Sequence, residues 1–178
     1  LSRLWKHTHS FPGEASIEKA RSLVDRRKIG VNENSVKLAS EGMGIDAGGI
    51  AKGYAARLAA DMLRNRGADD FILNFGGSVI SFGEERNIGI QDPFGKTGAH
   101  IGYVPVKDKA VVTSGSYERF VTLEGKKFSH IIDPRTGYPA DEGLISAALI
   151  GDDACELDAA ATAVIILGLE KGYELVRS

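Results

Sequence analysis

The sequence predicts an α+β fold in which helices pack on a mixed, mostly antiparallel sheet. Segments with the apolar spacing of helices lie near both ends of the chain, and many short strand-like segments lie between them. Glu124 and Gly125 form a tight-turn sequence between two of these segments, which is typical of an antiparallel hairpin. Because no repeat, low-complexity tract or linker interrupts the chain, we expect one compact domain over residues 1–178.

Four segments have the apolar spacing of helices. The first is followed by Gly30, which can end a helix. The second carries Tyr54, Leu58 and Met62 along one face and is followed by Gly67. The third is a buried helix, and the fourth is a short helix at the end of the chain. The expected helices cover residues 14–27, 50–66, 158–169 and 171–177.

Short apolar or alternating segments predict strands, whereas residues 1–13 are polar and irregular. The expected strands cover residues 35–39, 71–75, 79–82, 87–91, 100–106, 110–113, 120–123, 128–132 and 144–150.

Charge and composition exclude several classes of protein. Lys plus Arg number 22 and Asp plus Glu number 24, a net charge of −2, whereas a nucleic-acid-binding domain is strongly basic. The single cysteine, Cys155, excludes an intrachain disulfide framework and a cysteine-based zinc cluster. The longest nearly apolar stretch, residues 159–169, is too short to span a bilayer. We therefore expect neither a nucleic-acid partner nor a transmembrane segment.

A glycine-rich stretch, residues 42–53, lies between an expected strand and an expected helix. Glycines at such a junction let the backbone approach an anion, and the helix start adds unpaired N–H groups and a favourable dipole. Lys52 places a positive charge in the first turn. A capped helix start with turn glycines explains the stretch equally well. It does not follow the P-loop pattern or the full dinucleotide-binding pattern.

Two further stretches combine glycine with hydroxyl groups. Residues 74–78, Asn-Phe-Gly-Gly-Ser, form either a hairpin turn or a close approach of ligand to backbone. Residues 113–120 offer hydroxyl and backbone N–H groups. A serine hydrolase built on Ser114 or Ser116, with His130 as its base, is one candidate function, although the Gly-x-Ser-x-Gly elbow is missing.

Residues 130–139 bring together His130, Asp133 and Arg135. His130 suits a general base, and it suits a structural hydrogen bond as well. Arg119 and Arg135 fit phosphate or carboxylate clamps, and they fit solvated surface charges equally.

Asp158 and Thr162 are four residues apart, so on a helix their side chains project from one face toward one point. Apolar surroundings make an uncompensated carboxylate costly, which favours a cation as its partner. A carboxylate and a hydroxyl suit a hard ion such as Mg²⁺, with phosphate oxygens completing the ligand set. The alternative is that Asp158 caps the helix and Thr162 packs behind it.

Taken together, these stretches resemble the ApbE family of FAD:protein FMN transferases. They occur in the family's order and at about its spacing, and the resemblance runs from about Leu4 to about Gly168. It implies an ApbE or T-fold-like arrangement. The stretches that carry it are DAGGIAKGYA at 46–55, NFGGS at 74–78, TSGSYER at 113–119, HIIDPRTGYP at 130–139 and DAAAT at 158–162.

The resemblance implies a Mg²⁺-dependent enzyme with FAD as its substrate. FMN passes to a Thr or Ser hydroxyl of an acceptor protein and AMP leaves, and some relatives also hydrolyse FAD to FMN and AMP. Phosphoryl transfer of this kind needs positioning and charge neutralisation more than covalent chemistry. A magnesium ion, helix-start N–H groups and Lys52 would supply that neutralisation.

The resemblance also implies roles for single residues. The metal is expected at Asp158, Thr162 and the main-chain carbonyl of Gly49. Contacts with FAD are expected from Asp46, Lys52, Ser114, Gly115 and the backbone near Ile132. The catalytic candidates, which would activate the acceptor hydroxyl or hold the leaving AMP phosphate, are His130, Asp133 and Arg135.

Two departures from the family pattern bear on function. The family's domain usually begins earlier, so we expect the chain to be either the C-terminal portion of a longer domain or a reduced homologue. The usually acidic position after Tyr-Ala-Ala is Arg57, which we expect to be a surface change. The alternative function is a non-catalytic flavin-binding module.

Family members are commonly exported lipoproteins. We therefore expect the full-length protein in the periplasm or on the outer face of the cytoplasmic membrane, and we expect the present chain to be soluble.

Overall fold

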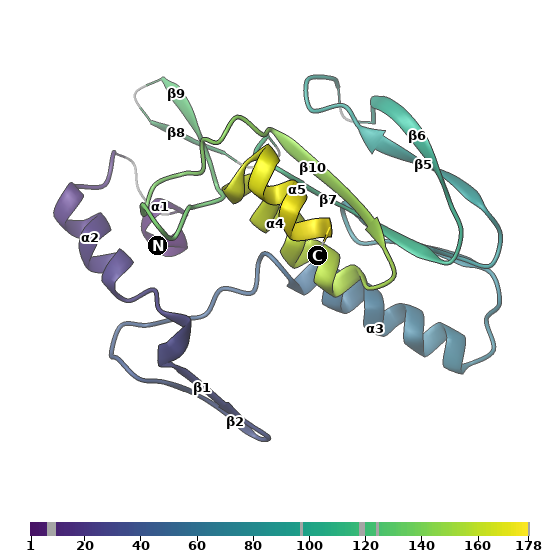
Figure 1. Cartoon of the computed structure of the whole chain (residues 1–178), viewed down its shortest axis with the longest axis horizontal. Helices are drawn as coiled ribbons and strands as arrows, with labels where there is room; N and C mark the ends of the chain where they lie inside the picture. The colour runs from purple at the N-terminus through teal and green to yellow at the C-terminus, as the bar shows by residue number, and fades with distance from the viewer. Residues whose placement is uncertain (7–9, 97, 118–119, 124, 178) are drawn as a thin grey trace. The chain divides into compact units, whose positions relative to one another are not determined.

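The computed structural model of the chain describes residues 1–6, 10–96, 98–117, 120–123 and 125–177 (Figure 1). It divides into two compact units. The first comprises Leu1–Asp46 and Arg119–Ala140, and the second comprises Ala47–Glu118 and Asp141–Ser178. Both units contain helices and antiparallel strand pairs, so the α+β prediction is confirmed.

A four-stranded antiparallel sheet forms the centre of the second unit. In spatial order, its strands are β10 (Ser146–Gly151), β7 (Lys109–Gly115), β4 (Ser78–Phe82) and β3 (Phe71–Asn74). The helices α3 (Ala51–Asn65) and α4 (Ala154–Leu167) pack on one face of this sheet (Figure 1). Helix α5 (Leu169–Arg177) packs on α4.

Strand β7 separates two hydrophobic cores of the second unit. Val112 faces the helices, in a core with Ala56 of α3 and Ala154 of α4. Val111 faces the opposite side, where a hairpin covers the sheet. This hairpin consists of β5 (Arg86–Gln91) and β6 (His100–Val106). Because side chains alternate along a strand, Ser114 lies on the helix side with Val112.

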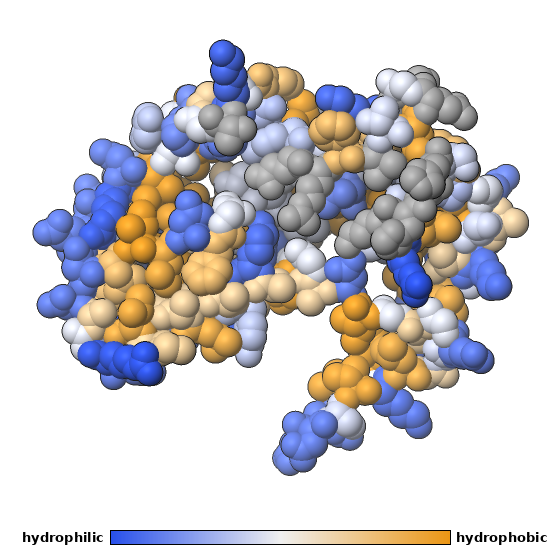
Figure 2. Space-filling view, turned by 180° about the vertical axis from the view of Figure 1, so that it is seen from behind, coloured by the Kyte–Doolittle hydropathy of each residue, from blue (hydrophilic) through white to orange (hydrophobic). Residues whose placement is uncertain are grey.

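Helix α3 begins and ends within one residue of the predicted bounds, but its buried face is made of small residues. The buried residues are Gly53, Ala56 and Ala60. The larger apolar residues Tyr54, Leu58 and Met62 are instead 46–52% exposed. Figure 2, which shows the side of the molecule where α3 lies, has apolar side chains at the surface there. The small face lets the backbones of α3 and α4 approach closely.

The first unit consists of short elements around an aromatic core. Trp5, Ile17 and Leu123 are buried together, and Trp5 Nε1 donates a hydrogen bond to the carbonyl of Gly137 at 2.9 Å. Its helices are α1 (Ser2–Lys6), α2 (Glu14–Ser22) and the 3₁₀ helix η1 (Arg26–Lys28). Its hairpins pair β1 (Ile29–Asn32) with β2 (Ser35–Leu38) and β8 (Phe120–Leu123) with β9 (Lys126–Ser129).

Some boundaries differ from those predicted. The helix expected over residues 14–27 ends at Ser22, and Asp25 then starts η1 by accepting a hydrogen bond from Arg27 N. Gly30 does not end a helix; it lies in β1, which was not predicted. Helix α1 lies within residues 1–13, where no element was expected. No helix in the described part of the chain is long and apolar enough to cross a membrane, and the expected export stays a prediction.

Candidate functional site

The start of α3 and the middle of α4 meet inside the second unit. The backbone N–H of Gly53 donates a hydrogen bond to Asp158 Oδ2 at 2.9 Å. Asp158 is only 1% exposed, although it is a carboxylate. A Cβ built on Gly53 would lie 2.7 Å from the Cβ of Asp158, so only glycine fits at this crossing. The two segments that the sequence analysis assigned to one site are therefore in direct contact.

Thr162, one helical turn after Asp158, lies at the same place. Its Oγ1 donates to the carbonyl of Asp158 at 3.2 Å and lies 3.2 Å from Ser114 Oγ at the end of β7. A Cβ built on Gly49 would lie 3.6 Å from Thr162 Oγ1, so the loop before α3 passes beside this hydroxyl. A carboxylate, two hydroxyls and the Gly49 backbone therefore gather where α3, α4 and β7 meet.

The turn between β3 and β4 joins this site through Lys52. Lys52 Nζ donates to the carbonyl of Gly76 at 3.3 Å, and Thr113 N donates to the carbonyl of Gly77 at 2.9 Å. Both glycines have positive φ, 61° and 95°, which a side chain rarely adopts. Asn74 Oδ1 accepts from both of their N–H groups. The stretch 74–78 is therefore a turn that borders the candidate site. Its residues are not among the predicted site residues, although paired glycines at a strand end are a signal for a close approach of ligand to backbone.

Asp158 does not cap α4, so the capping alternative is wrong. The N-cap is Asp153, whose Oδ1 accepts from the N–H groups of Cys155 and Glu156 at 2.7 and 3.1 Å. The helix thus begins at Ala154, earlier than the apolar pattern indicated, and Asp158 lies in its interior. Arg57 Nη1 forms an ion pair with the same Asp153 at 3.0 Å. Arg57, a basic residue at a position expected to be acidic, therefore links α3 to the N-cap of α4.

Two further candidates are Gly115 of the second unit and Asp46 of the first. Gly115 is the last residue of β7, and a Cβ there would lie 2.8 Å from Cδ1 of the Tyr117 ring. Asp46, expected to contact FAD, is exposed and is the last residue of the first stretch of the first unit.

A loop of the first unit holds the other candidates. Ile132 forms an isolated bridge with Pro139, and its side chain packs on the aromatic core. Asp133 is 5% exposed and accepts hydrogen bonds from Arg135 N at 2.7 Å and from Arg135 Nη2 at 2.7 Å. His130 is partly buried. The carboxylate and the guanidinium are thus bonded to each other and shape the loop. Arg119 lies outside the described residues.

The pKa of Asp133 is lowered, chiefly because the guanidinium of Arg135 hydrogen-bonds its carboxylate. A lowered pKa in the folded state stabilises the fold above the unfolded-state pKa, about 3.9, and this contribution is lost as pH falls below it.

We expect Asp133→Asn to destabilise the protein by about 1 kcal/mol at pH 7, a value reduced because Arg135 is partly exposed. The difference from wild type should shrink at about pH 3, below the unfolded-state pKa of about 3.9. Urea unfolding at pH 7 and at about pH 3 measures it, with the exposed Asp141→Asn as the control. An equal difference at both pH values would show that the charge of Asp133 is not the cause.

The serines of the hydrolase alternative are engaged elsewhere. Ser116 Oγ donates to the carbonyl of Ile145 at 3.2 Å, and Ser114 Oγ is paired with Thr162. Both serines belong to the second unit, whereas His130 belongs to the first. Among the described residues, the hydrogen bonds of the two serine hydroxyls go to Thr162 and to a main-chain carbonyl, neither of which is an activating base.

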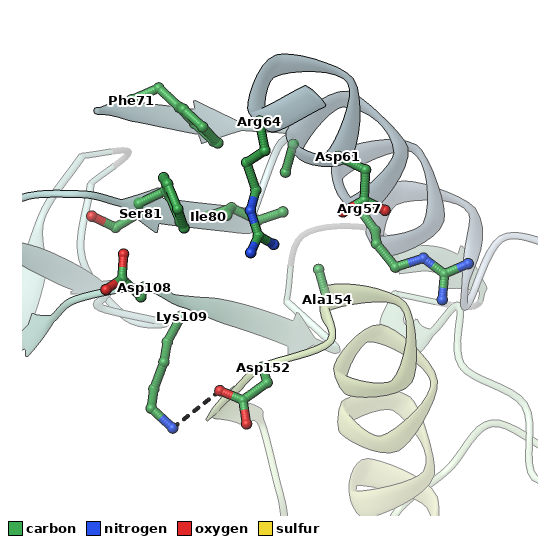
Figure 3. A pocket seen from close by; sticks show the side chains of 12 residues that line it. Arg57, Asp61, Arg64, Phe71, Ile80, Ser81, Asp108, Lys109, Asp152 and Ala154 are labelled. Atoms are coloured by element: carbon green, nitrogen blue, oxygen red, sulfur yellow. Dashed lines mark ion pairs between the residues drawn. The ribbon is translucent and has the colours of Figure 1, made fainter. Parts of the chain in front are cut away.

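A cavity of about 120 Å³ lies elsewhere in the second unit (Figure 3). The guanidinium of Arg64 points into it and lies over the ring of Phe82, 4.7 Å from its centroid. At its edge, Lys109 and Asp152 form an ion pair of 3.3 Å. None of the residues expected to bind FAD or metal lines this cavity.

Within the described residues, no group of three or more His, Cys, Asp or Glu side chains could hold a metal ion. The ligand set expected here is not such a group, because it combines the carboxylate of Asp158 with the hydroxyl of Thr162 and the carbonyl of Gly49.

Known proteins of one family share the sequence and the fold of this chain. The family model described as "ApbE family" matches residues 1–178. A protein of Klebsiella pneumoniae named FAD:protein FMN transferase is 39% identical over 182 residues, which cover 99% of this chain and 57% of that protein. The chain spans about half the length of the curated relatives that it matches.

Two solved structures share the fold. The ApbE protein from Thermotoga maritima superposes with a TM-score of 0.84 at 32% identity, over 94% of this chain and 55% of that one. The apo flavinyl transferase ApbE of Pseudomonas stutzeri has a TM-score of 0.82 at 26% identity, over 98% of this chain and 57% of that one. The sequence match over the whole chain and the shared fold lead to one conclusion: the chain belongs to the ApbE family.

Proposed function

We propose that this chain carries the metal and diphosphate site of an FAD:protein FMN transferase. The observation that supports this most strongly is the contact of the α3 start with Asp158, one helical turn before Thr162, because it places oxygen ligands beside a positively charged helix start. The names of the relatives supply the reaction, which is transfer of FMN from FAD to a protein. Because the family model includes both units, we also propose that the units act as one ApbE-like domain.

The oxygen donors at this point suit magnesium. Mg²⁺ prefers oxygen ligands, and it commonly takes one or two carboxylates together with substrate phosphates. Asp158, Thr162 and the Gly49 carbonyl would hold it. Asp158 also fits the role electrostatically, since a carboxylate that is 1% exposed gains from a nearby cation. When bound, the ion would draw charge from the diphosphate oxygens and so weaken the bond to the leaving group.

The start of α3 is suited to the negative charge of a diphosphate. Its N-cap is Ile50, which offers no side-chain hydrogen bond to the first turn. The N–H groups of Ala51 and Gly53 already donate to the Ala47 carbonyl and to Asp158, so it is chiefly the dipole of this 15-residue helix that favours an anion. Lys52 is held toward the Gly76 carbonyl and adds a full charge. We propose that Lys52, Asp46, Gly115 and the backbone near Ile132 contact FAD.

For the transfer step, we propose His130 as the group that receives the proton of the acceptor hydroxyl. Asp133 and Arg135 are bonded to each other, so their main effect is to shape the loop that carries His130. The hydroxyl oxygen of a Thr or Ser of the acceptor protein forms a bond to the FMN phosphorus. The bond between that phosphorus and the bridging oxygen breaks, and AMP leaves with the electron pair.

The test must take account of the greater length of the relatives. We suggest a chimera in which this chain replaces the matched region of the Klebsiella pneumoniae transferase. Incubated with FAD, Mg²⁺ and a Thr-containing acceptor peptide, the chimera should add the mass of FMN to the peptide and release AMP. The same chimera with His130→Ala should label much more slowly. FAD binding without labelling by the folded chimera would contradict the transferase proposal and favour a flavin-binding module.

A further inference from the structure

Ser114 is bonded to the protein in a way that does not suit a direct FAD contact. Its Oγ lies 3.2 Å from Thr162 Oγ1, and the residue is 9% exposed. Thr162 Oγ1 in turn donates to the carbonyl of Asp158 at 3.2 Å. The three residues thus form a chain of hydrogen bonds from the end of β7 into α4.

Counting the protons of this chain fixes its direction. A carbonyl oxygen can only accept, so the single hydroxyl proton of Thr162 is used on Asp158. The bond between the two hydroxyls then requires the proton of Ser114, which Ser114 gives to Thr162 Oγ1. No hydroxyl proton remains for a phosphate oxygen. The groups left open are lone pairs on both oxygens, and lone pairs attract a cation.

The backbone holds Ser114 firmly in this position. Ser114 pairs with Ala147 in the ladder between β7 and β10, and the preceding Thr113 N is bonded to the carbonyl of Gly77. A central strand bonded on both sides therefore presents the hydroxyl to α4. This rigidity is what a group needs if it is to orient a neighbouring ligand.

Resting on the proposed function, we propose that Ser114 is a positioning residue for the metal ligand Thr162. By donating its proton, Ser114 orients Thr162 Oγ1 so that a lone pair is directed away from both hydrogen bonds and is free for the cation. Its role is thus different from the FAD contact that the family resemblance implies.

The test is metal binding measured apart from catalysis. Mn²⁺ replaces Mg²⁺, and the electron paramagnetic resonance signal of free Mn²⁺ gives the affinity of the whole chain. We expect Ser114→Ala to weaken Mn²⁺ binding about 10-fold, which is the upper end for the loss of one hydrogen bond and the lower end for the loss of a group that supports a metal ligand. FAD affinity in EDTA, followed by flavin fluorescence, should not change.

Ser116→Ala is the matched control. It also removes a serine hydroxyl, but this hydroxyl donates to the Ile145 carbonyl and not to Thr162. The variant should therefore leave Mn²⁺ affinity unchanged. Thr162→Val tests the path of the effect. In that background, Ser114→Ala should cause no further loss of Mn²⁺ binding, because Ser114 acts through Thr162.

The outcomes separate the two proposals. If the wild-type chain binds FAD and Mn²⁺ but Ser114→Ala binds Mn²⁺ equally well, the positioning role is wrong and the proposed function stands. Loss of FAD affinity in EDTA for Ser114→Ala would restore the direct FAD contact. If the folded wild-type chain binds no Mn²⁺ with or without FAD, the metal site itself fails, and this inference fails with it.

Discussion

Asp158→Asn is expected to lower Mn²⁺ affinity about 100-fold or more. Loss of a group that only supports a metal ligand costs 10- to 100-fold, so loss of the charged ligand should cost at least as much. Asparagine keeps an oxygen that can accept the N–H of Gly53, so the contact between α3 and α4 should remain. The change therefore removes charge and leaves the geometry of the site in place.

Stability gives this prediction a second readout. A carboxylate that is 1% exposed is costly without a cation, so the metal-free Asp158→Asn protein should be at least as stable as wild type. Added Mn²⁺ should raise the melting temperature of wild type but not of the variant. Asp152→Asn is the control, because Asp152 lies on the neighbouring loop with an 85% exposed side chain. A variant that gains stability from Mn²⁺ as wild type does would show that Asp158 is not a ligand.

Gly53→Ala is expected to have the largest effect on folding. A Cβ at this position would overlap the carbonyl oxygen of Ala154 and lie 2.7 Å from the Cβ of Asp158. Neither atom is the end of a flexible side chain, so the helices must separate. Overpacking of this kind costs about 1–3 kcal/mol and sometimes more, and backbone atoms place this site at the upper end.

The measurement is thermal and urea unfolding of Gly53→Ala and of a control variant, Gly102→Ala. For a chain of this size, about 3 kcal/mol corresponds to a melting temperature lower by roughly 6–12 °C. Gly102→Ala is the matched control, because a Cβ there meets no atom within 4 Å. Unchanged stability of Gly53→Ala would mean that α3 and α4 are not as close as described.

The fold of the second unit could largely be predicted from the sequence, because its elements are long or strongly patterned. Helix α3 and strands such as β6 were predicted within one residue, since apolar spacing and flanking turns agree there. What periodicity could not show is which face of α3 is buried. Tyr54, Leu58 and Met62 form the more apolar face, but close approach of α4 requires the small residues around Gly53.

The first unit was predicted less well, because tertiary contacts hold its short elements. Helix α1 has only five residues, too few to form alone, and it depends on Trp5 in the aromatic core. The start of α4 was missed for a different reason. Two aspartates, Asp153 and Asp158, both suit a cap, and only the hydrogen bonds of Asp153 to the first turn distinguish them.

One part of the candidate site, the residues around Asp158 and Thr162, could be grouped from the sequence, but its internal bonding could not be predicted. The helical spacing of Asp158 and Thr162 indicated one face, and the family resemblance joined it to Gly49 and Lys52. The Gly53 N–H bond to Asp158 depends on the packing of two helices that are distant in sequence. The pairing of Ser114 with Thr162 depends on strand register in the same way, so neither could be read from a local pattern.

Crystals of the chain grown with Mn²⁺ and FAD would locate the metal through the anomalous scattering of manganese. We expect one peak bounded by the Asp158 carboxylate, Thr162 Oγ1 and the Gly49 carbonyl, with the FAD diphosphate reaching from it toward Lys52 and the α3 N-terminus. Bound FAD with its diphosphate away from α3, or a manganese peak that does not touch Asp158, would contradict this expectation.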